Sequence, residues 1–281
     1  MKHLTIFLCL ILFSESSFSR NTLEIQGPEL EEIKKETISV VDAFEVFKKT
    51  KHDWKWFHNE HVLFFSASSG NPVFKLKKFP EFFIKMRGEE RYNNIARTLE
   101  IIHRFNLDHI IIPHSLLIKV SGFHSNPSES ISVAIEESIE TRKAGGCYFD
   151  KNAVKNPRRR EEAEKLFAQL ARFMGETRYW DAHSGNIMLN KDKTSFVIVD
   201  LEEMFQTQTD LFKGIIKVLP NIHPIFHEEF LLHIAETQNM SVSQLKTHVS
   251  ETCATAMQKK CHSINDLYGK AWAECAANEE L

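Results

Sequence analysis

The chain has 281 residues, of which 42% are hydrophobic and 26% are charged, and its formal net charge is −3. This composition is that of a globular protein long enough to bury a substantial core, and it excludes a largely disordered chain. With 35 basic and 38 acidic residues there is no overall positive field, so we predict no nucleic-acid partner.

Residues 1–19 differ from the rest of the chain. A short basic start is followed by an apolar run from Leu4 to Phe13 and by small residues at Ser17 and Ser19. This pattern is typical of a secretory signal peptide cleaved between Ser19 and Arg20. The alternative is a membrane anchor, which needs about 18 to 20 apolar residues, and this run is shorter. We therefore predict a secreted or exported chain with no membrane span after cleavage.

The N-terminal half of the remaining chain predicts a small sheet with one helix. Residues 20–60 predict a helical extension that packs on this lobe. From Val62 to Lys85, apolar stretches alternate with turn residues, as in HVLFFS, PVFKLKK and EFFIKM, which predicts an antiparallel meander. From about Glu89 the apolar residues take a helical spacing. The segments HIIIPHSLLIKV and ISVAIEESIE then return to a strand pattern.

The C-terminal half is mainly helical by the same criteria. A helix begins near Pro157, and Gly175 is its expected stop. RYWDAHSGNIML follows, then two short strands in NIMLN and SFVIVD, and helical sequence continues to the end. We predict an α+β fold with a small N-terminal antiparallel sheet lobe and a larger, mainly helical C-terminal lobe.

Four cysteines lie beyond the predicted signal peptide, namely Cys147, Cys253, Cys261 and Cys275. In an exported chain they permit two disulfides. The spacings of the last three match no zinc-binding pattern. Buried free thiols remain the alternative.

Several polar residues stand beside the predicted strands. Lys85 follows the apolar FFI, and Asp181 precedes Asn186 by five positions in the loop before NIMLN. Asp200 follows the apolar FVIV. A carboxylate and a carboxamide at neighbouring strand ends offer the hard oxygen ligands that suit Mg²⁺ shared with phosphates. Asp181 would face an incoming hydroxyl group, so these residue types fit phosphoryl transfer.

This order of residues resembles the protein-kinase-like fold. Protein kinases have a strand lysine, a helix glutamate that pairs with it, an aspartate five residues before an asparagine, and a metal-binding aspartate after an apolar strand. The matching positions are Lys85, Glu100, Asp181, Asn186 and Asp200. The resemblance implies a kinase-like domain over residues 61–281, with an N-lobe of about 61–138 and a C-lobe of about 139–281.

The catalytic loop is most similar to one side of that superfamily. DAHSGNIM resembles the loop of aminoglycoside phosphotransferases, choline kinases and lipopolysaccharide-core sugar kinases, with His183 where most protein kinases have lysine. No long activation segment follows Asp200. His183 is either near the γ-phosphate and the aspartate or a structural residue that binds the loop backbone.

The resemblance also implies a set of ligands and their residues. ATP and Mg²⁺ are the expected cofactors, with Asn186 and Asp200 as metal ligands. Lys85 would bind the α- and β-phosphates, held by an ion pair with Glu100, while Glu89 and Glu90 are rival partners. Further expected nucleotide contacts are Gly70 in the covering loop and the backbone from Glu136 to Ser138, which would bond adenine.

Three positions depart from the family pattern. The nucleotide-covering loop SASSGN has Gly70 as its one glycine, and Tyr179 stands where the family usually has histidine. Leu201 and Glu202 follow Asp200 in place of Phe-Gly, and Glu202 is either a second metal ligand or an acid at a helix start. Two hypotheses therefore remain. One is an exported atypical kinase that phosphorylates a hydroxyl group of a protein, sugar or small molecule, and the other is a pseudokinase that serves as a binding or scaffold protein.

Overall fold

The computed structural model describes residues 23–50, 53–67, 71–124, 127–142, 147–149, 154–202, 204–258 and 261–277. The predicted signal peptide and Gly70 lie outside the described residues. In these ranges, no helix has both the length and the apolar character needed to cross a membrane.

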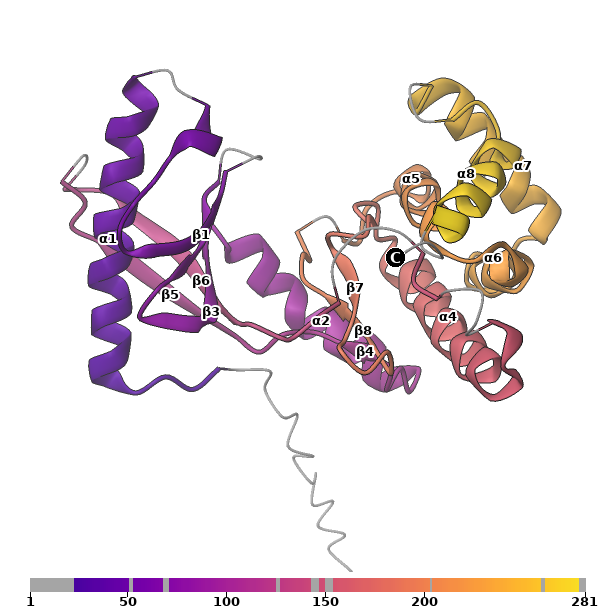
Figure 1. The fold of residues 1–281 in the computed structure, drawn as a ribbon, viewed down its shortest axis with the longest axis horizontal. Helices are drawn as coiled ribbons and strands as arrows, with labels where there is room; N and C mark the ends of the chain where they lie inside the picture. Colours follow the sequence, from indigo (N-terminus) through magenta and orange to yellow (C-terminus); the bar gives the residue numbers. More distant parts are fainter. Residues whose placement is uncertain are drawn as a thin grey trace, which may run out of the picture.

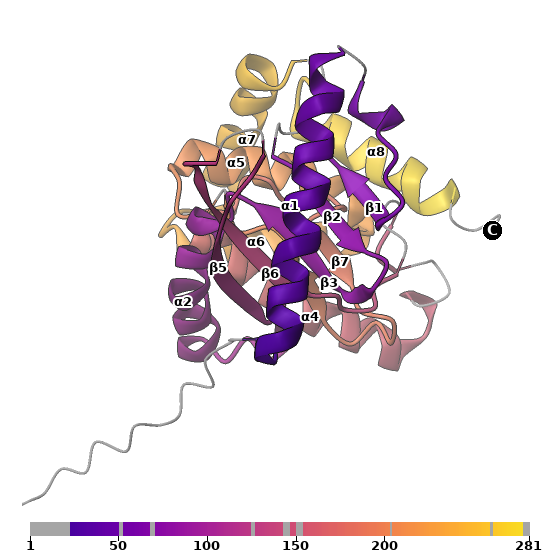
Figure 2. The same cartoon turned by 90° about the vertical axis from the view of Figure 1, so that its left-hand side faces the viewer.

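The N-terminal lobe is a five-stranded sheet covered on one face by a long helix. The sheet has the order β1-β2-β3-β6-β5, and all its neighbouring strands are antiparallel. Helix α1 crosses one face of it (Figures 1 and 2), so the predicted meander and the predicted helical extension are both confirmed. The elements are α1 (Gly27–Lys49), the 3-10 helix η1 (Trp54–Trp56), β1 (Val62–Ser66), β2 (Val73–Leu76), β3 (Phe79–Met86), β5 (Ser115–Ser121) and β6 (Ser130–Glu137).

The two faces of this sheet differ in chemistry. Successive side chains of a strand point to opposite faces, and Phe74, Ile84 and Ile135 are buried in one core with Ile33 and Val40 of α1. The neighbours of Ile84 and Ile135 in the chain therefore lie on the other face. That face carries a lysine from β3 and a glutamate from β6.

A helix and a small second sheet connect the N-terminal lobe to the helical lobe. In Figure 1, α2 and the three-stranded sheet lie between the large sheet and the remaining helices. The small sheet has the order β4-β8-β7, with β4 parallel to β8 and β7 antiparallel to it. These elements are α2 (Glu89–Arg104), β4 (Ile110–Ile111), β7 (Ile187–Leu189) and β8 (Phe196–Ile198).

The helical lobe surrounds the larger hydrophobic core. The side chains of Leu170, Phe173, Phe196 and Phe230 are fully buried in it, and Ile95 of α2 joins the same core. The α+β architecture with a small sheet lobe and a larger helical lobe is therefore confirmed. The elements are α4 (Pro157–Thr177), α5 (Gln208–Val218), η2 (Leu219–Asn221), η3 (Pro224–Phe226), α6 (His227–Thr237), α7 (Val242–Ala256) and α8 (Ile264–Ala277).

Gly175 does not end a helix, and that prediction is wrong. Helix α4 continues to Thr177 and ends at Arg178, whose φ is +51°. A Cβ at Gly175 would lie 2.0 Å from Oγ1 of Thr237. Glycine is therefore needed at this position because α6 approaches the backbone of α4, not because the chain turns there.

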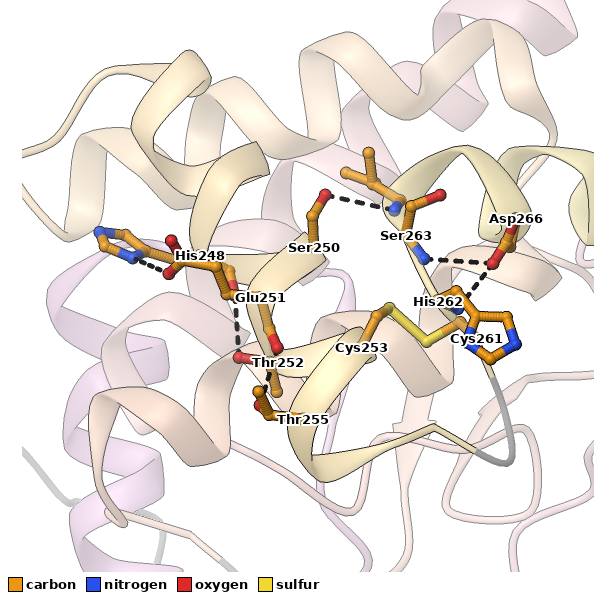
Figure 3. The surroundings of a disulfide bond; sticks show 11 residues. His248, Ser250, Glu251, Thr252, Cys253, Thr255, Cys261, His262, Ser263 and Asp266 are labelled. Atoms are coloured by element: carbon orange, nitrogen blue, oxygen red, sulfur yellow. Dashed lines mark hydrogen bonds and ion pairs between the residues drawn. A yellow bond between two sulfur atoms is a disulfide. The ribbon is translucent and has the colours of Figure 1, made fainter.

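Two disulfides join the cysteines, so the alternative of free thiols is wrong. Cys147 pairs with Cys275, and Cys253 pairs with Cys261. The second bond closes the turn between α7 and α8, beside the amides of His262 and Ser263, which donate to Asp266 (Figure 3). The first bond attaches the last helix to the segment before α4.

The environment of His227 predicts that the protein loses stability in mild acid. It is buried, its Nε2 contacts the carbonyl oxygens of Ile222 (2.8 Å) and Leu219, and its Nδ1 has no hydrogen-bond partner among the described residues. Burial lowers the pKa of His227, and His223 lowers it further, while the two carbonyl bonds and Glu228 raise it. The unfolded chain has the higher histidine pKa, so it binds the proton first as pH falls. The stability that depends on a neutral His227 is therefore intact above an ordinary histidine pKa of about 6.5 and is lost as pH falls below it.

We expect the free energy of unfolding to fall between pH 7 and pH 5 through this group. His227→Gln, which keeps a side-chain donor, should flatten that pH dependence in urea unfolding curves. His103→Gln, at an exposed position of α2, is the matched control. An unchanged slope in His227→Gln would contradict the assignment.

Candidate functional site

The predicted catalytic loop brings its acid and amide into direct contact. Nδ2 of Asn186 donates to Oδ2 of Asp181 at 2.9 Å and to the Asp181 carbonyl at 3.1 Å. The amide of His183 donates to the Asp181 carbonyl, and the amides of Asn186 and Ile187 donate to the His183 carbonyl. The loop is therefore a compact turn that fixes the direction of the Asp181 carboxylate.

His183 has a structural contact, and it also lies near the aspartate. Its Nδ1 accepts from the amide of Gly185 at 2.9 Å, and its Nε2 lies 3.7 Å from Oδ2 of Asp181. The side chain is half exposed. Both of the roles predicted from the sequence, bonding the loop backbone and approaching the aspartate, thus have a contact in the structure.

The hairpin of β7 and β8 brings Asn186 and Asp200 to the same edge. Ile187 pairs with Ile198, and the amide of Val199 donates to the Asn186 carbonyl at 3.0 Å. Asn186 precedes β7 and Asp200 follows β8, so the antiparallel pairing places both residues at one end of the hairpin. The sequence correctly grouped these two residues because both flank short apolar strands.

Lys85 reaches this edge from the large sheet. Its Nζ donates to the Val199 carbonyl at 2.5 Å and forms an ion pair with Oε2 of Glu136 at 2.8 Å. Burial lowers the pKa of Lys85 well below its usual value, and Arg91 lowers it further, while Asp200 and Glu202 oppose the shift. Lys85 is thus held by Glu136 and by the Val199 carbonyl, the latter directly before the predicted metal ligand Asp200.

The predicted ion pair between Lys85 and Glu100 is wrong. Glu100 is exposed on α2, and Glu136 of β6 is the carboxylate that Lys85 contacts. Glu136 lies opposite Phe83 in the β3–β6 register, so it shares a sheet face with Lys85. The rival glutamates Glu89 and Glu90 are also exposed.

Arg91 is a site residue that the sequence did not identify. It lies on α2, it is 1% exposed, and its guanidinium binds both carboxylate oxygens of Glu136. Its Nη1 also lies 3.2 Å from Oδ1 of Asp200. Here β3 still supplies the lysine, but the acid comes from β6 and helix α2 adds a second cation, whereas the family resemblance implied an acid on the helix. An arginine in the first turns of an amphipathic helix gives no local signal of burial.

Two backbone amides of the segment predicted to bond adenine already have partners. The amide of Glu137 donates to the His114 carbonyl at 2.9 Å, and that of Ser138 donates to the Glu81 carbonyl at 2.7 Å. The side chain of Glu136 points instead to Lys85 and Arg91. These two amides are therefore engaged within the protein, and the expectation that backbone groups from Glu136 to Ser138 bond adenine stays a prediction.

The oxygen donors beside Asp200 fit a magnesium ion. Oδ1 of Asp200 accepts from Nη1 of Arg91 and from the amide of Glu202, and its Oδ2 has no bonding partner within the described part of the chain. Burial raises the pKa of Glu202, and the neighbouring Asp200 carboxylate raises it further. Two carboxylates that repel each other at one edge, together with the Asn186 carboxamide, form a donor set suited to Mg²⁺. Within the described residues, no group of three or more His, Cys, Asp or Glu side chains is placed so that it could hold a metal ion by itself.

Comparisons with known proteins give structural matches but no sequence family. No family model and no curated protein matches this chain. The GDP and kanamycin complex of APH(2")-IIia matches with 9% identity and a TM-score of 0.35, covering 81% of this chain and 95% of that one. An aminoglycoside phosphotransferase from Alicyclobacillus acidocaldarius matches with 8% identity and a TM-score of 0.24, covering 79% and 93%.

The assignment of fold rests on the architecture itself. A small antiparallel sheet with one helix between its third strand and its last two strands is followed by a helical lobe that contains a short hairpin. A strand lysine of the sheet lobe contacts the Val199 carbonyl after the hairpin of the helical lobe, and the loop asparagine before that hairpin contacts the loop aspartate. The chain therefore has a bilobal α+β architecture, with a small antiparallel sheet lobe followed by a mainly helical lobe.

Proposed function

We propose that this chain is a kinase that transfers the γ-phosphoryl group of ATP to a hydroxyl group with the help of Mg²⁺. The observation that carries the proposal is that Asn186 contacts Asp181 in the loop, while Lys85 of the sheet lobe contacts the carbonyl of Val199, the residue before Asp200. Phosphoryl transfer needs mainly positioning and charge neutralisation, and these groups supply both.

Each residue has a defined task in this reaction. Lys85 would bind the phosphates of the nucleotide, and Asn186 and Asp200 would hold the metal. Bound Mg²⁺ would neutralise negative charge on the phosphates. Asp181 would orient the acceptor hydroxyl and accept its proton. The acceptor oxygen forms a bond to the γ-phosphorus while the bond from that phosphorus to the bridging oxygen breaks, and ADP leaves with that electron pair.

The chemical identity of the acceptor is a separate question. The short connection from Asp200 to α5, which begins at Gln208, favours a small molecule or sugar, whereas export would favour a protein target. The two disulfides support an exported chain because such bonds persist in oxidising compartments.

The test uses Asp200→Asn, which removes the metal-binding charge without changing the shape of the side chain. With Mg²⁺ and γ-labelled ATP, the wild-type chain should show hydrolysis or autophosphorylation. Asp200→Asn should lower the rate by about 100-fold or more, because charge stabilisation at the phosphates is lost. Asp192→Asn, at an exposed carboxylate in the β7–β8 turn, should keep wild-type turnover. Equal activity in Asp200→Asn and wild type would contradict the proposal.

One observation favours the alternative of a binding or scaffold protein. Arg91 forms an ion pair with the carboxylate that should take the metal, and a retained pair would hinder metal binding. In that case neither ATP nor Mg²⁺ should shift the melting temperature. A shift with both ligands together, combined with turnover, supports the kinase.

A further inference from the structure

Lys217 of α5 is a second residue at the site that the sequence did not identify. Its Nζ is 2.5 Å from Oδ1 of Asp181, and its side chain is only 9% exposed. It stands in GIIKVL, a largely apolar segment whose neighbours Ile215, Ile216 and Val218 are buried. Burial of a lysine side chain in such a segment is unfavourable in free energy unless a carboxylate pairs with it.

The packing of α5 against the catalytic loop explains how Lys217 reaches Asp181. A Cβ at Gly214 would lie 2.1 Å from the carbonyl oxygen of Tyr179, so the helix backbone touches the loop backbone at this glycine. Lys217 lies three residues further, on the same side of the helix. Its Nζ is 3.6 Å from the ring centroid of Trp180, which gives a cation–π contact in addition to the ion pair.

The start of α5 is also fixed. Thr207 and Asp210 form a reciprocal capping box, in which Oγ1 of Thr207 accepts from the Asp210 amide and the Asp210 carboxylate accepts from the Thr207 amide. Capping defines where the helix begins, and the contact at Gly214 defines where it docks. The position of the Lys217 ammonium is therefore determined by two features outside the loop.

The Asp181 carboxylate is held at both oxygens. Oδ1 contacts Lys217, and Oδ2 accepts from Nδ2 of Asn186 with Nε2 of His183 at 3.7 Å. Lys213, one turn earlier on α5, is different: it pairs with Asp210, it is 30% exposed, and its Nζ is 5.9 Å from the Trp180 ring. Only the later of these two lysines contacts the proposed acceptor-orienting residue.

We propose that Lys217 is a positioning residue for phosphoryl transfer, which holds the Asp181 carboxylate toward the acceptor and supplies the cation that the loop lacks at His183. This inference rests on the proposed kinase function. Holding the carboxylate by a buried ammonium on a helix fixes its direction more firmly than the half-exposed imidazole does. A misplacement of about 1 Å at such a group is expected to lower the rate by about 100-fold.

The experiment compares Lys217→Met, Lys217→Arg and Lys213→Met in the full chain, with Mg²⁺ and γ-labelled ATP. Hydrolysis of ATP is the readout, with water as acceptor. Lys217→Met should lower kcat by about 100-fold. The KM for ATP should stay nearly unchanged, because the ammonium contacts Asp181 and the nucleotide is bound by Lys85 in the proposed mechanism. Lys217→Arg keeps the charge and should restore much of kcat. Lys213→Met should match the wild type.

The outcomes separate this inference from the proposed function. If the wild type turns over ATP and Asp200→Asn does not, wild-type kcat in Lys217→Met overturns the role of Lys217 alone. If thermal unfolding shows that both variants are folded and kcat of Lys217→Arg is no higher than kcat of Lys217→Met, the role of Lys217 is also overturned. Absence of turnover in the wild type overturns both proposals.

Discussion

Replacing Glu136 by glutamine is expected to destabilise the protein by about 3–5 kcal/mol and to abolish turnover. The substitution leaves Lys85 and the buried Arg91 facing a neutral amide, and of these two only Arg91 keeps a carboxylate contact within the described part of the chain, with Asp200. Removing one partner of a buried ion pair destabilises a protein by far more than the intact pair stabilises it, because an uncompensated charge stays buried. Turnover should be lost because Lys85 no longer has the ion pair that holds it in position.

The matched control for this prediction is the next residue of the same strand. Glu137 is 45% exposed and its carboxylate lies 3.6 Å from His114, so Glu137→Gln should change stability by less than about 1 kcal/mol. Urea unfolding at pH 7 measures both variants. A loss below about 1 kcal/mol in Glu136→Gln would show that the three charges are not coupled as the contacts indicate.

A double-mutant cycle tests whether Arg91 accounts for the loss of stability in Glu136→Gln. Arg91→Met in the Glu136→Gln background removes one of the two cations that the first change leaves unpaired. We expect the double variant to be more stable than the sum of the two single changes predicts, because contacting residues in one network are not additive. Additive effects would instead place Arg91 and Glu136 in independent roles.

Removing the disulfide between Cys147 and Cys275 is expected to cost about 5 kcal/mol of stability, against about 2.5 kcal/mol for the other disulfide. The two bonds close loops with sequence separations of 128 and 8 residues. A crosslink over a longer loop restricts the unfolded chain more strongly, so its removal raises the entropy of the unfolded state by more.

Paired variants give this comparison directly. Cys147→Ser with Cys275→Ser and Cys253→Ser with Cys261→Ser each remove one bond without leaving a lone thiol. Guanidinium unfolding of both against the wild type yields the two free-energy differences. Equal losses, or a larger loss for Cys253 and Cys261, would show that loop length does not determine the effect and that local packing of these buried cysteines does.

The order of elements and the members of the catalytic loop could be predicted from local sequence. Strands β1, β2, β3 and β6, helix α2 and helix α4 have apolar periodicities that are visible within ten to twenty residues. Asp181 and Asn186 are close in sequence, and Asp200 follows a short apolar strand, so their proximity required only one hairpin. The prediction that Gly175 ends helix α4 is wrong because a glycine needed for contact with α6 has the same local sequence pattern as a glycine that ends a helix.

The partner of each charged residue, in contrast, depended on the tertiary structure. Lys85 pairs with Glu136 instead of Glu100 because the β3–β6 register puts Glu136 on the same sheet face, and a shift of one residue would point it away. Lys217 reaches Asp181 because α5 docks at Gly214. Short-range patterns are therefore enough to specify the α+β elements and the loop chemistry. Which charges meet depends on strand register and helix docking, and these are set by contacts between distant segments.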